Sequence, residues 1–479
     1  MSADLILLDG KILTMNPSQP CAEAVAIKQD RIVKVGAREE IAQLIGKSTK
    51  VIRLNEKTLV PGLIDTHIHV ADFGRLLAWV DLHDLKSIKE LQSRIEERAR
   101  GTPAGKWVIG RGWDQDCFAE QRLLTRYDLD AASLDNPVVL YHQTGQLCVV
   151  NSKALELAGV TKQTSNPPDG VIDKDAETGE PTGVLRDAAT NLVWNMVPAP
   201  SEEELVNAAA LACEKIVEAG VTSVHWMVLT SAEISIIQRL RRENRLPLRV
   251  YLVIPMKLFD NVACSSLLKD SGDEVVKVGG VEIFADGYSA ARTAALFQPY
   301  ADCPDSSGSL LYTQEEMNAL ATKIRKANLQ LVIHAMGDKA VDAALNAIEE
   351  TSGVPLGKAL RSRIEQAAVL NERLIERMAK QKVIVSVQPR VVASEFSVWS
   401  AVNRLGAERA RWLFPLNTLL ETGVKVVGGS DCPMEPLSPL LGIQAAVTRE
   451  FFPEERITVD EALRLYTVDA AYSSFEEHI

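Results

Sequence analysis

Two histidines, His67 and His69, follow an apolar segment at residues 59–64 and are separated by a single residue. In an extended chain, side chains at positions i and i+2 point to the same side, so both imidazole groups can reach one metal ion. A lone His-x-His is a weak signal, but the preceding Val-Pro-Gly-Leu-Ile-Asp-Thr strengthens it. The pattern therefore predicts half of a metal site at the end of a strand.

Two further polar residues end apolar segments. His334 follows residues 331–333, although a hydrogen-bonded core histidine is an alternative. Asp431 follows residues 424–430, where a carboxylate is costly unless it is paired or bound to a cation. It could instead cap the next helix. Because the histidine pair, His334 and Asp431 all end strands, one shared site is favoured over separate structural roles.

The elements around these residues alternate between apolar strands and amphipathic helices, such as the helix expected at residues 201–219. This alternation indicates a parallel sheet with right-handed crossovers. Eight strands, the number that closes a barrel, are expected at residues 59–64, 221–227, 248–254, 281–285, 331–334, 363–367, 383–387 and 424–429. Active sites of such barrels lie at the carboxyl ends of the strands, where the candidate ligands occur.

The gap between the first two strands is too long for one helix. We therefore expect an inserted lid subdomain at about residues 85–200 that covers the barrel mouth, within a barrel domain at residues 59–455. Short apolar bursts in residues 1–58 predict a small sheet, and residues 456–479 form a C-terminal segment with a closing helix at 458–471.

Composition limits the classes of partner. The 479 residues are 46% hydrophobic and 24% charged, as in a globular protein, and the net charge of −12 opposes nucleic-acid binding. No apolar run is long enough to cross a membrane, and the first residues do not resemble a secretory signal, so we expect a cytoplasmic location. The seven scattered cysteines fit reduced thiols. We expect a small-molecule substrate and leave homo-oligomer formation open.

Taken together, the motifs resemble the amidohydrolase superfamily and, within it, the third amidohydrolase family, which includes enzymes similar to N-substituted formamide deformylase. The resemblance covers nearly the whole chain, and its motifs are PGLIDTHIH at residues 61–69, GRGWDQ at 110–115, NSKAL at 151–155, GVLRD at 183–187, ADG at 285–287, HAMGD at 334–338 and GSD at 429–431. It implies a (β/α)8 TIM-type barrel joined to a small β-sandwich built from both chain ends. The sandwich would be small or incomplete here, because family members usually continue beyond the position of Ile479.

The resemblance also implies roles for the candidate residues. His67 and His69 would bind the first ion, His334 would bind metal from the fifth strand, and Asp431 would bind metal and shuttle a proton. The implied reaction is hydrolysis of a carbon–nitrogen bond in an amide or carbamate-like small molecule by metal-bound hydroxide. We expect zinc, while manganese, iron and cobalt suit the same ligands.

Three residues depart from the family pattern. Glu282 stands where the family has a lysine that carries a carbamate, and it would ligate directly unless it forms a salt bridge instead. Gln366 replaces the histidine of strand six, and an amide oxygen is a poor zinc ligand. We therefore expect one tightly held ion, with a second one loose. Gln146 replaces a histidine in the inserted segment, where it would approach the substrate, and Gln366 is likewise expected to contact the substrate.

Two other expected substrate contacts have a structural alternative. Trp113 would line the pocket or pack in a core, and Arg292 would meet a substrate oxygen or anchor a loop. His225 ends a strand and would donate a hydrogen bond near the site. Two other functions stay open: a mononuclear deaminase of a ring amidine, for which Glu365 is a partial match to the usual acid, and a barrel that binds without catalysis.

Overall fold

The computed structural model describes residues 2–133, 135–263, 273–353, 361–398 and 400–479. Contacts divide the chain into two compact units, one formed by Met1–Val70 with Cys213–Ile479 and the other by Ala71–Ala212. Six cysteines are free thiols, and Cys264 lies outside the described residues. In the described part of the chain, no helix is long and apolar enough to cross a membrane.

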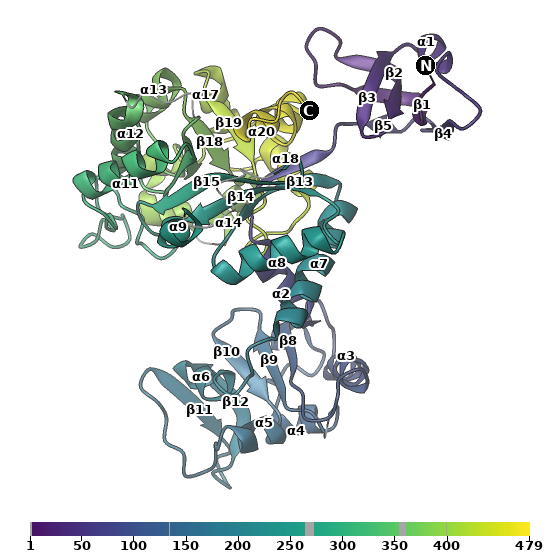
Figure 1. The fold of residues 1–479 in the computed structure, drawn as a ribbon. Helices are drawn as coiled ribbons and strands as arrows, with labels where there is room; N and C mark the ends of the chain where they lie inside the picture. Colours follow the sequence, from purple (N-terminus) through teal and green to yellow (C-terminus); the bar gives the residue numbers. More distant parts are fainter. Residues whose placement is uncertain (1, 134, 264–272, 354–360, 399) are drawn as a thin grey trace. The chain divides into compact units, whose positions relative to one another are not determined.

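Eight parallel strands form a nearly closed barrel in the first unit (Figure 1). The strands, in neighbouring order, are β6 (Leu63–Ile68), β13 (Val221–Met227), β14 (Arg249–Pro255), β15 (Val276–Phe284), β16 (Gln330–Ala335), β17 (Arg363–Gln366), β18 (Ile384–Val387) and β19 (Lys425–Gly428). Most of their residues are buried, as expected for a parallel sheet covered on both faces. The α/β barrel predicted from the sequence is therefore present.

The two outer strands of the sheet, β6 and β19, meet at their carboxyl ends. The backbone N–H of Asp431 donates to the carbonyl of His67 at 2.8 Å, and that of His69 donates to the carbonyl of Cys432 at 2.9 Å. These two bonds join the residues that follow β19 to the end of β6. They place the first and last strands of the barrel side by side at the edge where the candidate ligands lie.

The bounds predicted for the first barrel strand, residues 59–64, are wrong. Thr58–Leu59 forms a separate short strand, β5, which pairs with the N-terminal sheet, and β6 begins only at Leu63. Pro61 explains the break, because proline has no N–H to donate to a sheet. His67 consequently lies within β6 rather than after it. The other predicted strands each overlap an observed one.

The crossover helices pack outside the barrel strands. Helix α11 begins after Thr313, and α8 begins after Thr230; both threonines form capping boxes with a glutamate three residues later. The helices of this part of the chain are α7 (Glu202–Glu218), α8 (Ser231–Arg242), α9 (Met256–Ala263), α11 (Gln314–Lys326), α12 (Asp338–Glu350), α13 (Glu372–Gln381), α14 (Pro389–Ser397), α15 (Ala401–Leu405), α16 (Ala407–Ala410), α17 (Leu416–Glu421) and α18 (Pro439–Thr448).

The N-terminal part of the chain forms one sheet, and the described C-terminal part ends in helices. The N-terminal strands form one five-stranded sheet, β1 (Leu5–Leu13), β2 (Cys21–Lys28), β3 (Arg31–Gly36), β4 (Lys50–Arg53) and β5, with helix α1 (Arg38–Ala42). The predicted closing helix is two helices, α19 (Val459–Leu465) and α20 (Val468–Ser473), because Thr467 adopts a non-helical conformation between them. A β-sandwich that includes the C-terminus stays a prediction.

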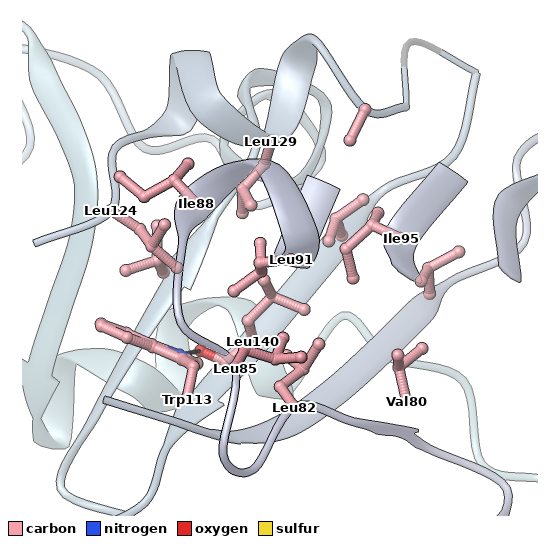
Figure 2. Packing of buried hydrophobic residues seen from close by; sticks show 14 of the residues in the cluster. Val80, Leu82, Leu85, Ile88, Leu91, Ile95, Trp113, Leu124, Leu129 and Leu140 are labelled. Carbon is pink, nitrogen blue, oxygen red and sulfur yellow. Dashed lines mark hydrogen bonds between the residues drawn. The ribbon is translucent and has the colours of Figure 1, made fainter. Parts of the chain in front are cut away.

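The second unit has its own sheet and core. Its strands follow the order β11 (Gly170–Lys174), β12 (Pro181–Asp187), β10 (Leu147–Val150), β9 (Val138–His142), β8 (Val108–Trp113) and β7 (Val80–Asp81). Its helices are α2 (Val70–Leu77), α3 (Ile88–Arg100), α4 (Arg126–Asp130), α5 (Ser152–Leu157) and α6 (Asn191–Trp194). Buried side chains of α3, β8 and β9 form one of its hydrophobic clusters (Figure 2). That this unit acts as a lid stays a prediction.

Candidate metal centre

The structure brings His67, His69 and Asp431 together at the carboxyl ends of β6 and β19. Oδ1 of Asp431 lies 3.6 Å from Nε2 of His67 and 3.4 Å from Nε2 of His69. Gly429 makes this approach feasible, since a Cβ at that position would lie 2.7 Å from the backbone nitrogen of His67. The glycine of the Gly-Ser-Asp motif therefore lets the strand of the aspartate lie against the strand of the histidines.

Asp65 links the same two strands from within. Its Oδ1 accepts hydrogen bonds from the backbone N–H of His67 at 3.1 Å and from that of Ser430 at 2.9 Å. Burial raises the pKa of Asp65 to about 6 despite these bonds. This carboxyl group connects the backbone of His67 to that of Ser430, which precedes Asp431. The contact explains why an aspartate occurs in the otherwise apolar segment before His67.

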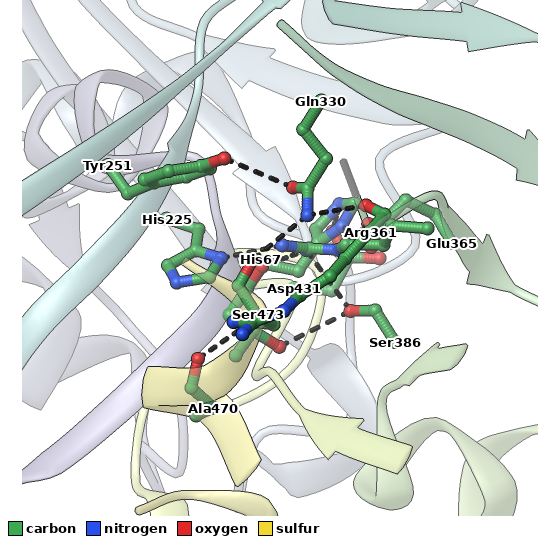
Figure 3. A network of polar contacts seen from close by, with 12 residues as sticks. His67, His225, Tyr251, Gln330, Arg361, Glu365, Ser386, Asp431, Ala470 and Ser473 are labelled. Carbon is green, nitrogen blue, oxygen red and sulfur yellow. Dashed lines mark hydrogen bonds and ion pairs between the residues drawn. The ribbon is translucent and has the colours of Figure 1, made fainter. Parts of the chain in front are cut away.

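A buried carboxylate fixes the orientation of His67 (Figure 3). Nδ1 of His67 lies 2.7 Å from Oε2 of Glu365, which is fully buried. Glu365 in turn forms an ion pair with the buried guanidinium of Arg363. A histidine whose Nδ1–H donates to a carboxylate presents Nε2 as a metal ligand. The contact therefore directs Nε2 of His67 toward Asp431.

The pKa values of His67, Glu365 and Asp431 are set by burial and by the charges of neighbouring side chains. Burial alone would lower the pKa of His67, but the carboxylates of Asp431 and Glu365 outweigh burial and raise the pKa to about 9. Burial would raise the pKa of Glu365, but Arg363 and His67 lower it to about 2. For Asp431, burial opposes ionisation, while His67 and His69 lower its pKa. In the metal-free site, the ionised carboxylates of Asp431 and Glu365 thus lie beside a protonated His67, whose proton a cation would replace.

Gln366 does not act as a simple replacement for a histidine ligand. Its Nε2 donates to Oδ2 of Asp431 at 3.3 Å, while its Oε1 is buried without a hydrogen-bond partner among the described residues. The amide therefore holds the second oxygen of the aspartate whose first oxygen faces the histidines. This positioning contact was not predicted from the sequence.

Glu282 and His334, the other predicted ligands, lie outside the compact group of three. Burial raises the pKa of Glu282 to about 8, and its Oε1 has no hydrogen-bond partner in the described part of the chain. Burial lowers the pKa of His334 to about 4, so its ring is neutral. Nε2 of His334 lies 3.4 Å from the carbonyl of Gly287, and its ring stacks on Phe284. Their ligand roles remain predictions.

The donor set fits a divalent cation. The ligand atoms of His67, His69 and Asp431 all lie within 4.8 Å of one another. Two imidazole nitrogens and a carboxylate oxygen suit zinc and other first-row divalent ions. The unpartnered oxygens of Glu282 and Gln366 add buried acceptors that a cation or its water ligands would satisfy.

Two predicted substrate contacts of the barrel have other partners. His225 is 1% exposed, and its Nδ1 lies 2.6 Å from Nη1 of Arg363. Burial and the charge of Arg363 lower the pKa of His225 well below its usual value, so the ring is a neutral acceptor (Figure 3). Arg292 pairs with Asp302 through two contacts of 3.1 and 2.6 Å. The contact of Arg292 corresponds to its structural alternative as a loop anchor, while the role of His225 as a donor near the site stays a prediction.

The two candidates of the inserted unit differ in exposure. Trp113 is fully buried, and its indole N–H donates to the carbonyl of Leu140 at 3.1 Å (Figure 2). It therefore has no exposed surface for a substrate, and the packing alternative describes it. Gln146 is exposed in the turn before β10 and keeps its predicted role as a prediction.

Sequence reasoning missed Arg363, which the structure places at the centre of the polar network. Its guanidinium is fully buried, pairs with Glu365, and donates to the carbonyl of Thr66 and to Oγ of Ser386. The available signal was the pattern Arg-Ile-Glu in a strand that should be apolar. Two charges at alternating positions of a buried strand must be paired.

A nearly closed parallel barrel with two histidines and an aspartate at its strand ends is an α/β-barrel protein with a candidate metal centre. The solved structure of a metal-dependent hydrolase from Pyrococcus furiosus has the same fold. It superimposes with a TM-score of 0.78 at 31% identity, covering 99% of this chain and 95% of that chain.

Two sequence relatives extend over almost the whole chain. The protein YtcJ of Bacillus subtilis (strain 168) is 34% identical over 483 residues, which cover 98% of this chain and 90% of YtcJ. The N-substituted formamide deformylase of Arthrobacter pascens is 28% identical over 492 residues, covering 98% of this chain and 89% of that enzyme. The amidohydrolase family matches residues 50–479. This chain belongs to the amidohydrolase family.

Proposed function

We propose that this protein is a metal-dependent hydrolase that cleaves a carbon–nitrogen bond in an amide or carbamate-like small molecule. The observation that carries the proposal is the convergence of His67, His69 and Asp431 within 4.8 Å at the carboxyl ends of barrel strands. Its similarity to an N-substituted formamide deformylase supports this substrate class.

His67, His69 and Asp431 would hold the ion, and zinc suits these ligands best. A bound divalent ion supplies activation of water near neutral pH and polarisation of the scissile carbonyl. Asp431 is the proton carrier. Its carboxylate is ionised, since its pKa is lowered, and its Oδ2 is oriented by the amide of Gln366. The same oxygen takes a proton from the attacking water and delivers it to the leaving nitrogen.

Glu282 and His334 provide the remaining donors of a second, weaker site. Both are buried near the strand ends, and the neutral ring of His334 is ready to ligate or to donate a hydrogen bond to a substrate oxygen. The raised pKa of Glu282 means that a second ion must displace a proton from its carboxyl group. One tightly held ion and one loosely held ion are therefore expected.

The deaminase alternative is disfavoured by the position of Glu365. A deaminase would need this acid near the reacting ring, but Glu365 is fully buried and is engaged by His67 and Arg363. Removing it from those partners would leave the guanidinium of Arg363 uncompensated.

The test is metal content together with hydrolysis of N-substituted formamides, amides and carbamates, measured for the wild type and for His67→Ala. The substitution should remove most of the bound metal and lower turnover at least about 100-fold, because a ligand is lost. His478→Ala changes an exposed histidine and is the matched control; it should retain the bound metal and the turnover of the wild type. Unchanged metal and turnover in His67→Ala would contradict the proposal, and a wild type that binds no metal and hydrolyses nothing with added zinc would favour a binding role.

A further inference from the structure

The inserted unit contains a cavity of about 430 Å³ that is built entirely from its own residues. Its walls are formed by the end of α2, the chain segment that follows α2, strands β8 and β9, and helix α6. This volume lies within the range of small-molecule sites. Neither the proposed metal ligands nor the residues that orient them take part in it.

Three aromatic rings form one wall of the cavity. The rings of Trp79 and Tyr141 stack with centroids 6.0 Å apart, and Trp194 meets each of them edge-on at 5.8 Å. Trp194 is 38% exposed although it belongs to this cluster. Because the rings contact one another, they make a continuous wall rather than a cage that encloses a cation. Such a wall favours stacking of a planar ring.

A basic side chain, that of Arg111, lines the cavity. Among the residues that the structure describes, its guanidinium forms no ion pair within 4 Å, although Asp81, its neighbour across β7 and β8, lies close enough to interact with it electrostatically. The nearby acid Asp81 is already paired with Nδ1 of His83 at 2.6 Å. Within the described chain, the cavity lining contains no acidic side chain. A guanidinium without a close ion-pair partner, beside an aromatic wall, favours an anion with two oxygens, such as a carboxylate.

A buried donor without a partner adds to this site. His142 also lines the cavity and is 7% exposed. Its Nδ1 accepts from the backbone N–H of Thr144 at 3.2 Å, so the proton lies on Nε2. That Nε2 has no hydrogen-bond partner among the described residues, and the nearest carboxylate oxygen, of Asp114, is 3.6 Å away. A bound acceptor would satisfy it.

Gly112 explains the local chain geometry. Its φ is +94°, and a Cβ there would come within 2.3 Å of the ring of His83. The glycine therefore allows His83 to lie against β8, next to Arg111. The Gly-Arg-Gly-Trp motif at residues 110–113 thus contributes to the shape of this cavity.

We propose that this cavity is a binding site for a planar aromatic carboxylate. The ring packs against the wall formed by Trp79, Tyr141 and Trp194, face-on to one of these rings and edge-on to the others, and the carboxylate pairs with Arg111. The site does not depend on the proposed function, since its residues lie apart from the metal ligands in the chain and it needs no metal.

The test is isothermal titration calorimetry of the full-length, chelator-treated protein. The probes are 2-naphthoate, its neutral analogue 2-naphthylmethanol, the cationic 2-naphthylmethylammonium, and the non-aromatic cyclohexanecarboxylate. Saturable binding of one 2-naphthoate per chain is expected, at least about tenfold tighter than that of each other probe, because one charge-assisted pair or the stacking is lost. Absence of 2-naphthoate binding, or tighter binding of the ammonium probe, would overturn the proposal.

Two variants at exposed or half-exposed positions locate the site. Arg111→Gln should weaken 2-naphthoate at least about tenfold while leaving 2-naphthylmethanol unchanged. Trp194→Ala should weaken both aromatic probes. Trp412→Ala, a tryptophan of the other unit, is the control and should change neither. Circular dichroism establishes that each variant is folded. Folded Arg111→Gln and Trp194→Ala proteins that bind 2-naphthoate as the wild type does would place the ligand elsewhere and contradict the assignment.

Discussion

Nδ1 of His67 and Oε2 of Glu365 lie 2.7 Å apart in the interior of the barrel, although 298 positions separate the two residues in the chain. The contact runs from the first barrel strand to the sixth. It fixes which imidazole nitrogen faces Asp431, and the ion pair between Glu365 and Arg363 fixes the carboxylate in turn. A candidate metal ligand, its carboxylate partner and a buried guanidinium therefore form one chain of contacts.

Glu365→Gln should lower metal affinity about 10- to 100-fold, because the substitution removes the charge that makes His67 a stronger ligand. The measurement is competition with a chromophoric chelator. Glu349→Gln changes an exposed glutamate that also contacts an arginine, Arg377, and should leave the affinity unchanged. Equal affinities of wild type and Glu365→Gln would show that the buried carboxylate does not support the ligand.

Gly429→Ala should destabilise the protein by about 1–3 kcal/mol, since the new methyl group would collide with the backbone of His67. The same displacement should separate Asp431 from the histidines and reduce bound metal. Chemical denaturation and elemental analysis measure the two effects. Gly353→Ala is the control, because nothing lies within 4 Å of its added Cβ. A stable, fully metallated Gly429→Ala protein would argue against the close strand approach.

Gln366→His should raise the metal content toward two ions per chain. An imidazole would replace the amide that now donates to Oδ2 of Asp431, and imidazole is the better ligand. Elemental analysis after dialysis against zinc is the measurement, with Gln381→His on the exterior of the barrel as control. A stoichiometry equal to that of the wild type would indicate that Gln366 does not face a second ion site.

Metal binding should strengthen as the pH rises from about 6 to about 9. In the metal-free protein, His67 has a pKa of about 9 and Glu282 one of about 8, so both carry protons at neutral pH. An ion must displace each proton from a group that it binds, which changes affinity by about tenfold per pH unit for each proton released. Calorimetry in buffers of different ionisation enthalpy counts these protons. Affinity that is independent of pH over this range would contradict the charge assignment.

The sequence predicts the barrel and the three clustered candidate ligands because both depend on local patterns. Apolar segments followed by His67, His69 and Asp431 mark strand ends at one edge of a parallel sheet. The first strand was misplaced because the apolar run crosses Pro61, where the chain leaves one sheet before it enters another.

The supporting contacts could not be predicted in the same way. The bonds from Glu365 to His67 and from Gln366 to Asp431 join distant strands, and only the closed sheet determines which side chains meet. Trp113 shows that a motif can also suggest a substrate contact where the structure has a core residue. Its motif resembles a family pattern, yet only the packing of the inserted unit shows that its ring is buried in a core.

The most direct test of the metal centre is a crystal structure of protein purified without chelator, with anomalous diffraction data collected on both sides of the zinc edge. We predict an anomalous peak about 2.0–2.2 Å from Nε2 of His67, Nε2 of His69 and an oxygen of Asp431. A peak at another position, or none at these three residues after zinc has been supplied, would contradict it.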